Sequence, residues 1–171
     1  MHNVECKYEL REPEFARAGI RRLGGAHVAT VDQVDTYFRV PTGRLKKRET
    51  VGESAQWIRY DRVNRAAPRL SQFDVFDERS AIERFGSRPL PVRCVVRKRR
   101  EVYAAEGVRI HLDEVQGLGW FLEFEALVGP TRSVMQCHAA IERLRIELGP
   151  AMGEPIAVGY ADLLAPEPGA G

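Results

Sequence analysis

The sequence lacks several features that define large classes of protein. No run of about 18 consecutive apolar residues occurs, which argues against a membrane-spanning helix. The first residues are polar and contain no apolar segment of the secretory type. The three cysteines, Cys6, Cys94 and Cys137, are widely spaced and form no C-x-x-C pair, which argues against a disulfide framework and a structural zinc site. We therefore expect a cytoplasmic protein without a membrane partner.

The length of the chain predicts one domain, and the distribution of charge along it predicts the kind of ligand. The 171 residues and the hydrophobic fraction of 44% suit one domain, which we expect at residues 1–164, with a disordered tail at 165–171. The net charge is only +2, but residues 39–100 hold 17 Lys and Arg against 7 Asp and Glu, whereas residues 101–171 hold 4 against 11. Strands of opposite charge should therefore meet in the fold, which suits an anion bound together with a metal cation.

Alternating polarity predicts many short strands. The opening stretch H-N-V-E-C-K-Y-E-L places Val4, Cys6, Tyr8 and Leu10 on one face, with polar side chains on the other. The predicted strands are 3–10, 33–40, 44–49, 57–63, 71–76, 92–103, 108–115 and 120–128. The predicted helices are 11–25, 77–88 and 131–149, with a last helical turn at 160–164. This pattern indicates a closed antiparallel barrel or a sandwich, and a closed barrel of about eight strands can hold one small ligand.

Most of these strands carry a stripe of charge on one face. Arg44, Lys46 and Arg48 share a face of their strand, as do Lys98 and Arg100 of another, and Glu123 and Glu125 of a third. Composition alone favours a solvated face of a sheet. The basic and acidic side chains lie on different strands, which argues against a solvated face. Arginine binds phosphate oxygens and paired carboxylates bind Mg²⁺ or Mn²⁺, so this separation suits a site for both.

The order of three motifs resembles a known family. These motifs are E-C-K near the N-terminus, then Q-V-D-T-Y-F-R-V-P-T-G-R-L-K-K-R-E, then R-I-H-L-D-E-V-Q-G-L-G-W-F-L-E-F-E. Together they are similar to the CYTH family, the triphosphate tunnel superfamily that includes class IV adenylate cyclases and thiamine triphosphatases. The similarity extends from about Asn3 to Tyr160.

The resemblance implies an α+β fold, in which a closed eight-stranded antiparallel barrel with flanking helices encloses a charged tunnel. It also implies a triphosphate substrate bound with Mg²⁺ or Mn²⁺. By position, the metal ligands would be Glu5, Glu123 and Glu125. The phosphate contacts would be Lys7, Lys46, Arg48, Arg59, Lys98 and Arg100, with Arg44 near the tunnel mouth. Glu5 and Asp113 would be catalytic, with one of them orienting a water, and strand parity places Arg62 opposite Arg59.

Two positions depart from the family pattern. The N-terminal signature of the family is E-x-E-x-K, but here Asn3 replaces the first Glu, which weakens any second metal site. The family also often has a basic residue shortly before the final S-Y-x-x-L-L, and the stretch E-P-I-A-V-G-Y-A-D-L-L has none. The hydrolytic details are therefore open at this stage.

The leading functional hypothesis is metal-dependent hydrolysis of a linear triphosphate, such as tripolyphosphate, thiamine triphosphate or a nucleoside triphosphate. The alternatives are an adenylate cyclase that makes cyclic AMP and pyrophosphate from ATP, and a non-catalytic binder of polyphosphate or nucleotides. RNA binding is disfavoured because the carboxylates would repel a phosphate backbone. We expect a small-molecule partner, no nucleic acid, and a monomer or homodimer. His111 is expected in the tunnel or on the surface, and Tyr37 is expected to pack.

Overall fold

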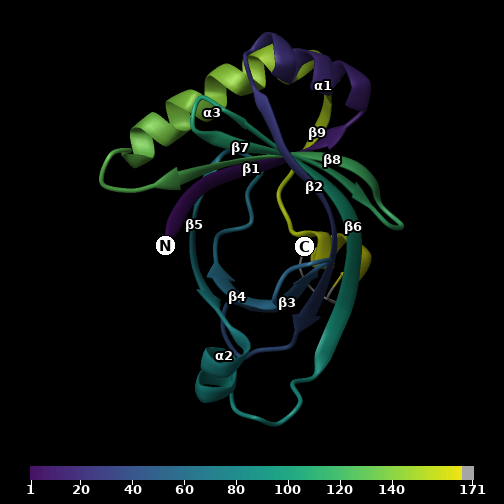
Figure 1. Cartoon of the computed structure of the whole chain (residues 1–171), viewed down its shortest axis with the longest axis vertical. Coiled ribbons are helices and arrows are strands. Elements are labelled where there is room, and N and C mark those ends of the chain that lie inside the picture. Colours follow the sequence, from purple (N-terminus) through teal and green to yellow (C-terminus); the bar gives the residue numbers. More distant parts are fainter. Residues whose placement is uncertain (167–171) are drawn as a thin grey trace.

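A computed structural model describes residues 1–166 (Figure 1). Within these residues the strands are β1 (His2–Leu10), β2 (Ala26–Phe38), β3 (Arg44–Thr50), β4 (Gln56–Asp61), β5 (Arg69–Phe76), β6 (Val92–Ala105), β7 (Val108–Val115), β8 (Gly119–Val128) and β9 (Met152–Ile156). The helices are α1 (Pro13–Arg22), α2 (Glu78–Phe85), α3 (Val134–Leu148) and α4 (Tyr160–Leu164), with a 3₁₀ turn at Gly149–Ala151. Most of the tail for which we predicted disorder lies outside the described residues.

The strands form a closed antiparallel barrel, as predicted. The order β5-β4-β3-β2-β6-β7-β8-β1 closes through a pairing of β5 with β1. One edge of β1 pairs with β8, and its other edge pairs with two strands. Residues 2–5 of this edge pair with β5, and residues 7–10 pair with β9. Strand β9 was not predicted, because it contains Gly153 and Pro155 and, within residues 1–166, pairs with β1 alone at the edge of the sheet. The predicted start of β2 was seven residues late, because residues 26–32 do not alternate in polarity.

The main hydrophobic core lies outside the barrel rather than within it. The apolar face of β1 joins Ile110 and Leu112 of β7 and Leu122 and Phe124 of β8 in one buried cluster. Helices α1 and α3 cover this cluster, and Figure 1 shows both helices lying across the same side of the barrel. Because successive side chains of a strand point to opposite faces, the intervening polar side chains are directed into the barrel. The helices therefore stabilise the barrel from outside and leave its interior to charged groups.

A smaller apolar cluster closes one end of the barrel. Tyr160 and Ala161 of α4 pack against Val96, Val115 and Phe121, and the rings of Phe121 and Tyr160 meet edge to face at 5.1 Å. None of the helices within residues 1–166 is both long enough and apolar enough to cross a membrane.

Candidate active site

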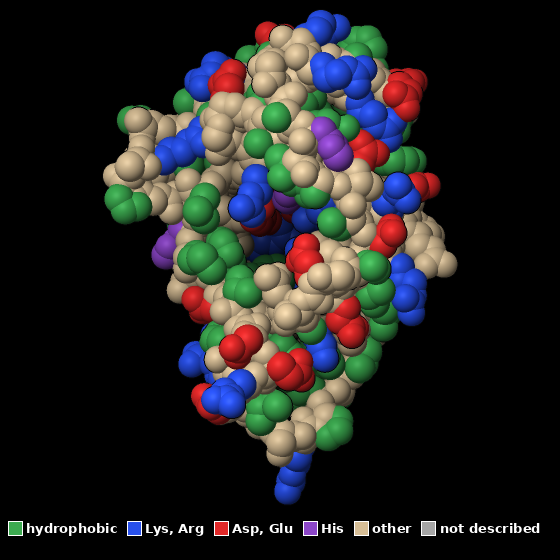
Figure 2. Space-filling model, viewed as in Figure 1, with side chains coloured by type: hydrophobic (Ala, Val, Ile, Leu, Met, Phe, Trp, Pro, Cys, Tyr) green, Lys and Arg blue, Asp and Glu red, His purple; other side chains and the backbone are tan. Residues whose placement is uncertain are grey.

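The barrel encloses a charged cavity with a volume of about 310 Å³. Its lining includes seven cationic side chains, namely Lys7, Lys46, Arg48, Arg62, Lys98, Arg100 and Arg109. Three carboxylates, Glu5, Glu123 and Glu125, share it. Figure 2 shows the hollow in the middle of this face of the molecule, with blue Lys and Arg atoms at its floor. The excess of cations makes the cavity attractive to a polyanion.

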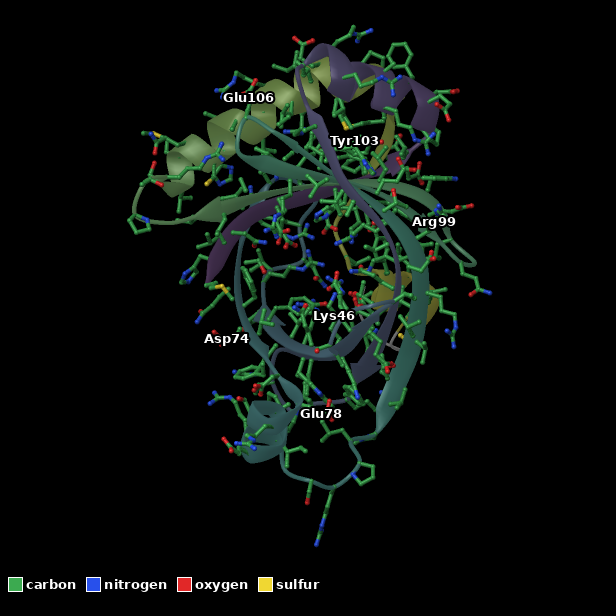
Figure 3. The ribbon with its side chains drawn as sticks, in the orientation of Figure 1. Lys46, Asp74, Glu78, Arg99, Tyr103 and Glu106 are labelled. Atoms are coloured by element: carbon green, nitrogen blue, oxygen red, sulfur yellow. The ribbon has the colours of Figure 1, made fainter. Side chains whose placement is uncertain are left out.

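Asp35 of β2 organises the cations on one side of the cavity. Its carboxylate is completely buried and accepts hydrogen bonds from Lys46 Nζ at 3.0 Å and Lys98 Nζ at 2.8 Å. Arg48 adds a bidentate pair, with both contacts at 2.8 Å. Figure 3 shows Lys46 reaching into the barrel from β3, whereas Asp74 and Arg99 lie on its outer side. One carboxylate thus holds three cations in fixed positions.

Burial and mutual repulsion shift the pKa values of this group. Burial would raise the pKa of Asp35, but the three cations hold it well below its usual value. Burial, together with the neighbouring Arg48 and Arg100, lowers the pKa of Lys98 to about 7, although the charge of Asp35 acts to raise it. Burial, together with Arg48, lowers the pKa of Lys46 to about 8. Both lysines therefore titrate near neutral pH, and a bound anion would favour their charged forms.

Arg100 is fixed from behind by Asp113. The two side chains form a bidentate pair with both contacts at 2.6 Å, and the Tyr160 hydroxyl donates to the same carboxylate at 2.7 Å. Asp113 is completely buried, and the positive charge of Arg100 holds its pKa below the usual value although burial alone would raise it. Arg100 also reaches Glu123 at 2.9 Å. Asp113 therefore orients Arg100, whose guanidinium lines the cavity.

Each cavity carboxylate has a polar partner of its own. Glu123 lies 3.8 Å from Lys7 and 3.6 Å from His111 Nδ1, in addition to Arg100. Burial would raise the pKa of Glu123, but Lys7, a hydrogen bond from His111 and Arg100 hold it well below its usual value. Glu5 pairs with Arg62, which donates to it, and lies 3.5 Å from Arg69. Glu125 instead accepts a hydrogen bond from the Asn3 amide.

The donor chemistry of these carboxylates fits a hard divalent cation. Glu5 and Glu125 are cross-strand partners, and Glu123 is two residues from Glu125 on the same face, so their oxygens border one region. Within residues 1–166, however, no three His, Cys, Asp or Glu side chains are gathered closely enough to hold a metal ion. A metal would therefore require Glu5 to separate from Arg62, which a bound phosphate could bring about by attracting that arginine.

The structure places most of the predicted site residues together. The predicted residues that line the cavity are Glu5, Lys7, Lys46, Arg48, Lys98, Arg100, Glu123 and Glu125. Asp113 lies directly behind them. Arg44 does not line the cavity and instead donates to the Arg62 carbonyl at 3.1 Å and to Asn64 at 2.7 Å. The roles of these residues in metal and phosphate binding stay predictions.

The predicted placement of Arg59 is wrong. The cavity-facing residues of β4 are Gln56, Ile58 and Tyr60, so Arg59 points outward, where it donates to the Thr42 hydroxyl at 3.3 Å. The next residue of the same parity as Tyr60 is Arg62, which lies just beyond β4 and lines the cavity. Parity had separated Arg59 from Arg62, but it could not decide which face is the inner one.

Three kinds of residue at the site were not predicted there. Asp35 was not predicted as a site residue, although it shares a strand face with Gln33 and Tyr37. Tyr37 packs as expected and Tyr160 begins the predicted last helical turn, and both also line the cavity, where Lys7 Nζ lies 3.6 Å above the ring of Tyr160. Arg109 also lines the cavity, and its parity with His111 was the available signal.

Comparison with known proteins identifies the family. The sequence profile of the CYTH domain matches residues 1–160. The chain belongs to the CYTH family. Among curated proteins, the "Putative adenylate cyclase MJ0240" of Methanocaldococcus jannaschii is 25% identical over 137 residues, which cover 73% of this chain and 77% of that protein.

Solved structures share the fold. The PH1012 protein of Pyrococcus horikoshii superimposes with a TM-score of 0.76 at 23% identity, covering 94% of this chain and 98% of that one. The HpAC1 protein of Hippeastrum, whose description reads "Putative adenylyl cyclase HpAC1 from Hippeastrum reveals a dominant triphophatase activity", superimposes with a TM-score of 0.60 at 17% identity, covering 92% of both chains. Proteins that share this barrel fold therefore include one described both as a putative adenylyl cyclase and as a triphosphatase.

Proposed function

We propose that this CYTH protein binds a linear triphosphate in the barrel cavity and hydrolyses it with Mg²⁺ or Mn²⁺. The observation that carries the proposal is the convergence of cations from β1, β3 and β6 on one cavity. Lys7, Lys98 and Arg100 are buried there, and Lys46 and Arg48 are partly buried. Phosphoryl transfer needs charge neutralisation and in-line positioning more than covalent help. A small-molecule substrate suits a cavity of about 310 Å³.

In this reaction, the side chains of the cavity would neutralise charge, hold the cations in position and accept a proton. The lysines and arginines neutralise the phosphate oxygens, and Asp35 and Asp113 keep those cations in place. Glu5, released from Arg62, is placed to orient a water and to accept its proton as the water attacks the terminal phosphorus. The bond from that phosphorus to the bridging oxygen breaks, yielding orthophosphate and the remaining diphosphate.

Glu5, Glu123 and Glu125 would hold the metal ion. A bound Mg²⁺ or Mn²⁺ would neutralise charge on the phosphate oxygens and on the leaving group. Asn3 contributes a neutral amide at the position where a further carboxylate would add charge, and its buried Oδ1 has no hydrogen-bond partner among the described residues. These features support one metal ion more readily than two.

Adenylate cyclisation is the second candidate. It would use the same grip on the triphosphate but a ribose hydroxyl as the nucleophile in place of water. The name of the M. jannaschii relative favours it, whereas the description of the Hippeastrum protein favours triphosphate hydrolysis. We rank hydrolysis first because it requires no further binding site for the nucleophile.

A substrate screen tests the proposal. Tripolyphosphate, thiamine triphosphate and nucleoside triphosphates are incubated with Mg²⁺ or Mn²⁺, and both orthophosphate and cyclic nucleotide are measured. We expect orthophosphate release that Lys46→Met lowers by about 10²-fold or more, because a phosphate contact in the cavity is lost. Lys47→Met is the matched control, since Lys47 is adjacent on β3 but faces outward to Glu78. Cyclic AMP as the main product would overturn hydrolysis, and binding without turnover would leave a non-catalytic binder.

The lysine pKa values predict a pH dependence of anion binding. Because Lys98 and Lys46 have pKa values of about 7 and about 8, both lose charge as the pH rises from 7 to 9. Metal-free ATP still loses part of its last phosphate proton near pH 7, so its charge is constant only above about pH 8. Between pH 8 and 9 its affinity should fall by up to about tenfold for each lysine. Calorimetry in two buffers of different ionisation enthalpy should show proton uptake on binding at pH 8. Lys98→Met should reduce that uptake, and an affinity that is flat or rising from pH 8 to 9 would contradict the prediction.

A further inference from the structure

Lys7 of β1 is buried at the cavity without a hydrogen bond to hold it. It is 3% exposed, and the Glu123 carboxylate lies 3.8 Å from its Nζ atom, which is too far for a hydrogen bond. Within residues 1–166, no protein group accepts a hydrogen bond from this ammonium. An ammonium that leaves water without such partners is costly, so another interaction must offset its desolvation.

The ring of Tyr160 supplies this interaction. The Lys7 Nζ atom lies 3.6 Å from the centroid of the ring, and Tyr160 is itself only 3% exposed. The face of an aromatic ring carries partial negative charge, which attracts a cation most strongly where water is excluded. This attraction acts on the charge of the ammonium as a whole, so it does not tie each N–H donor to a fixed acceptor. Lys7 therefore keeps donors available for the cavity that it lines.

Several contacts fix the ring of Tyr160 in one orientation. Its hydroxyl donates to Asp113 at 2.7 Å, and the ring meets that of Phe121 edge to face with the centroids 5.1 Å apart. Helix α4 is itself held beside β6 by the ion pair of Arg93 with Asp162, at 2.8 Å (Figure 1). The cost of ordering this side chain is therefore met when the protein folds and not when an anion binds.

The other two lysines of the cavity lining are held in a different way. Lys46 and Lys98 each donate to Asp35, at 3.0 Å and 2.8 Å, so part of their donor capacity is used within the protein. Lys7 has the ring in place of a carboxylate. If the ring were absent, Lys7 could close the 3.8 Å gap to Glu123 and form a hydrogen-bonded ion pair, which an incoming anion would have to break.

We propose that Tyr160 is a positioning residue, which holds Lys7 apart from Glu123 and leaves its N–H donors free for the oxygens of a bound anion. The inference rests on the proposed function, since it takes the anion to bind in the cavity. It assigns the ring face, rather than the hydroxyl, as the part of Tyr160 that acts on anion affinity. Helix α4 then contributes to anion binding although none of its residues carries a positive charge.

Two variants that share a shape but differ in the ring face test this inference. Tyr160→Phe removes only the hydroxyl, whereas pentafluorophenylalanine at position 160 also removes the partial negative charge of the ring face. Isothermal titration calorimetry at pH 7 without a divalent metal measures the dissociation constant of tripolyphosphate. We expect Tyr160→Phe to stay within about threefold of the wild type and the fluorinated variant to bind about five- to 30-fold more weakly. Lys7→Met should remove the difference between the two variants.

The controls separate the ring face from the docking of the helix. Leu163→Ala on α4 changes a side chain that packs in the apolar cluster but does not line the cavity, so the affinity should stay within about twofold. If the fluorinated protein does not fold, as judged by circular dichroism, para-fluorophenylalanine replaces it, with an expected loss of about two- to fivefold relative to Tyr160→Phe.

The possible outcomes also separate the two proposals. Equal affinities of Tyr160→Phe and the fluorinated variant, or an equal loss in Leu163→Ala, would overturn the inference and leave the proposed function intact. No binding of tripolyphosphate to the wild type, or binding that Lys98→Met does not weaken, would overturn the proposed function.

Discussion

Replacing Asp35 by asparagine is expected to lower the free energy of unfolding by about 3–5 kcal/mol. The substitution keeps the shape of the side chain but removes the charge that holds Lys46, Arg48 and Lys98 together. Three cations would then lie close to one another in a buried space without a counter-charge. The cost is large because Lys98 is almost completely buried and would repel the neighbouring Lys46 and Arg48 without a counter-charge between them.

Urea unfolding at pH 7, followed by circular dichroism, measures this effect. Asp32→Asn is the matched control, because Asp32 lies on the same strand, is exposed and should change the unfolding free energy by no more than about 0.5 kcal/mol. Addition of tripolyphosphate should restore part of the stability of Asp35→Asn, since the anion supplies the missing negative charge. Equal unfolding free energies for the two variants would contradict the role that the structure gives to Asp35.

Glu123→Gln and Glu125→Gln are each expected to lower metal-dependent turnover by about 10²–10³-fold. Glutamine preserves the size of the side chain but removes the anionic oxygen that a divalent cation prefers. The two variants should differ in anion binding without metal. Glu123 is paired with Lys7 and Arg100, so the loss of its charge frees cations, whereas Glu125 accepts a hydrogen bond from the neutral Asn3 amide.

Two readouts separate metal binding from catalysis. Mn²⁺ binding in the presence of ATP, followed by electron paramagnetic resonance, should weaken in both variants. Metal-free ATP binding should become tighter in Glu123→Gln and change less in Glu125→Gln. Glu114→Gln is the control, since this exposed residue of β7 lies outside the cavity. Phosphate release at the wild-type rate in both cavity variants would remove these glutamates from the metal site.

The opening strand shows which features of the site could be predicted from sequence patterns. The alternation from Asn3 to Leu10 determined that Glu5 and Lys7 share a face, and the structure places both at the cavity. The same parity rule grouped Lys46 with Arg48, and Glu123 with Glu125. Parity is local information, because it depends only on the geometry of one extended chain. It therefore determined the groupings of most site residues without any knowledge of the fold.

Which face of a strand points into the barrel cannot be determined from the strand's own alternation. In β4, parity separated Arg59 from Ile58 and Tyr60, but both alternatives were equally consistent with the local pattern. Closure of the barrel decided the question, since it turned Ile58 and Tyr60 inward and brought Arg62 to Glu5 across 57 residues of sequence. The result depends on how β4 pairs with β3 and β5, which no single strand encodes.

The sequence by itself determined which side chains of each strand share a face and how charges of opposite sign are separated along the chain. Through its motifs it also determined the resemblance to the CYTH family. Only the tertiary structure decided that Asp35 holds three cations and that Asp113 lies behind Arg100. These contacts join side chains from separate strands. The ion pairs among them become strong when burial removes water from between the charges. Until the barrel closes, those charges remain solvated and interact only weakly.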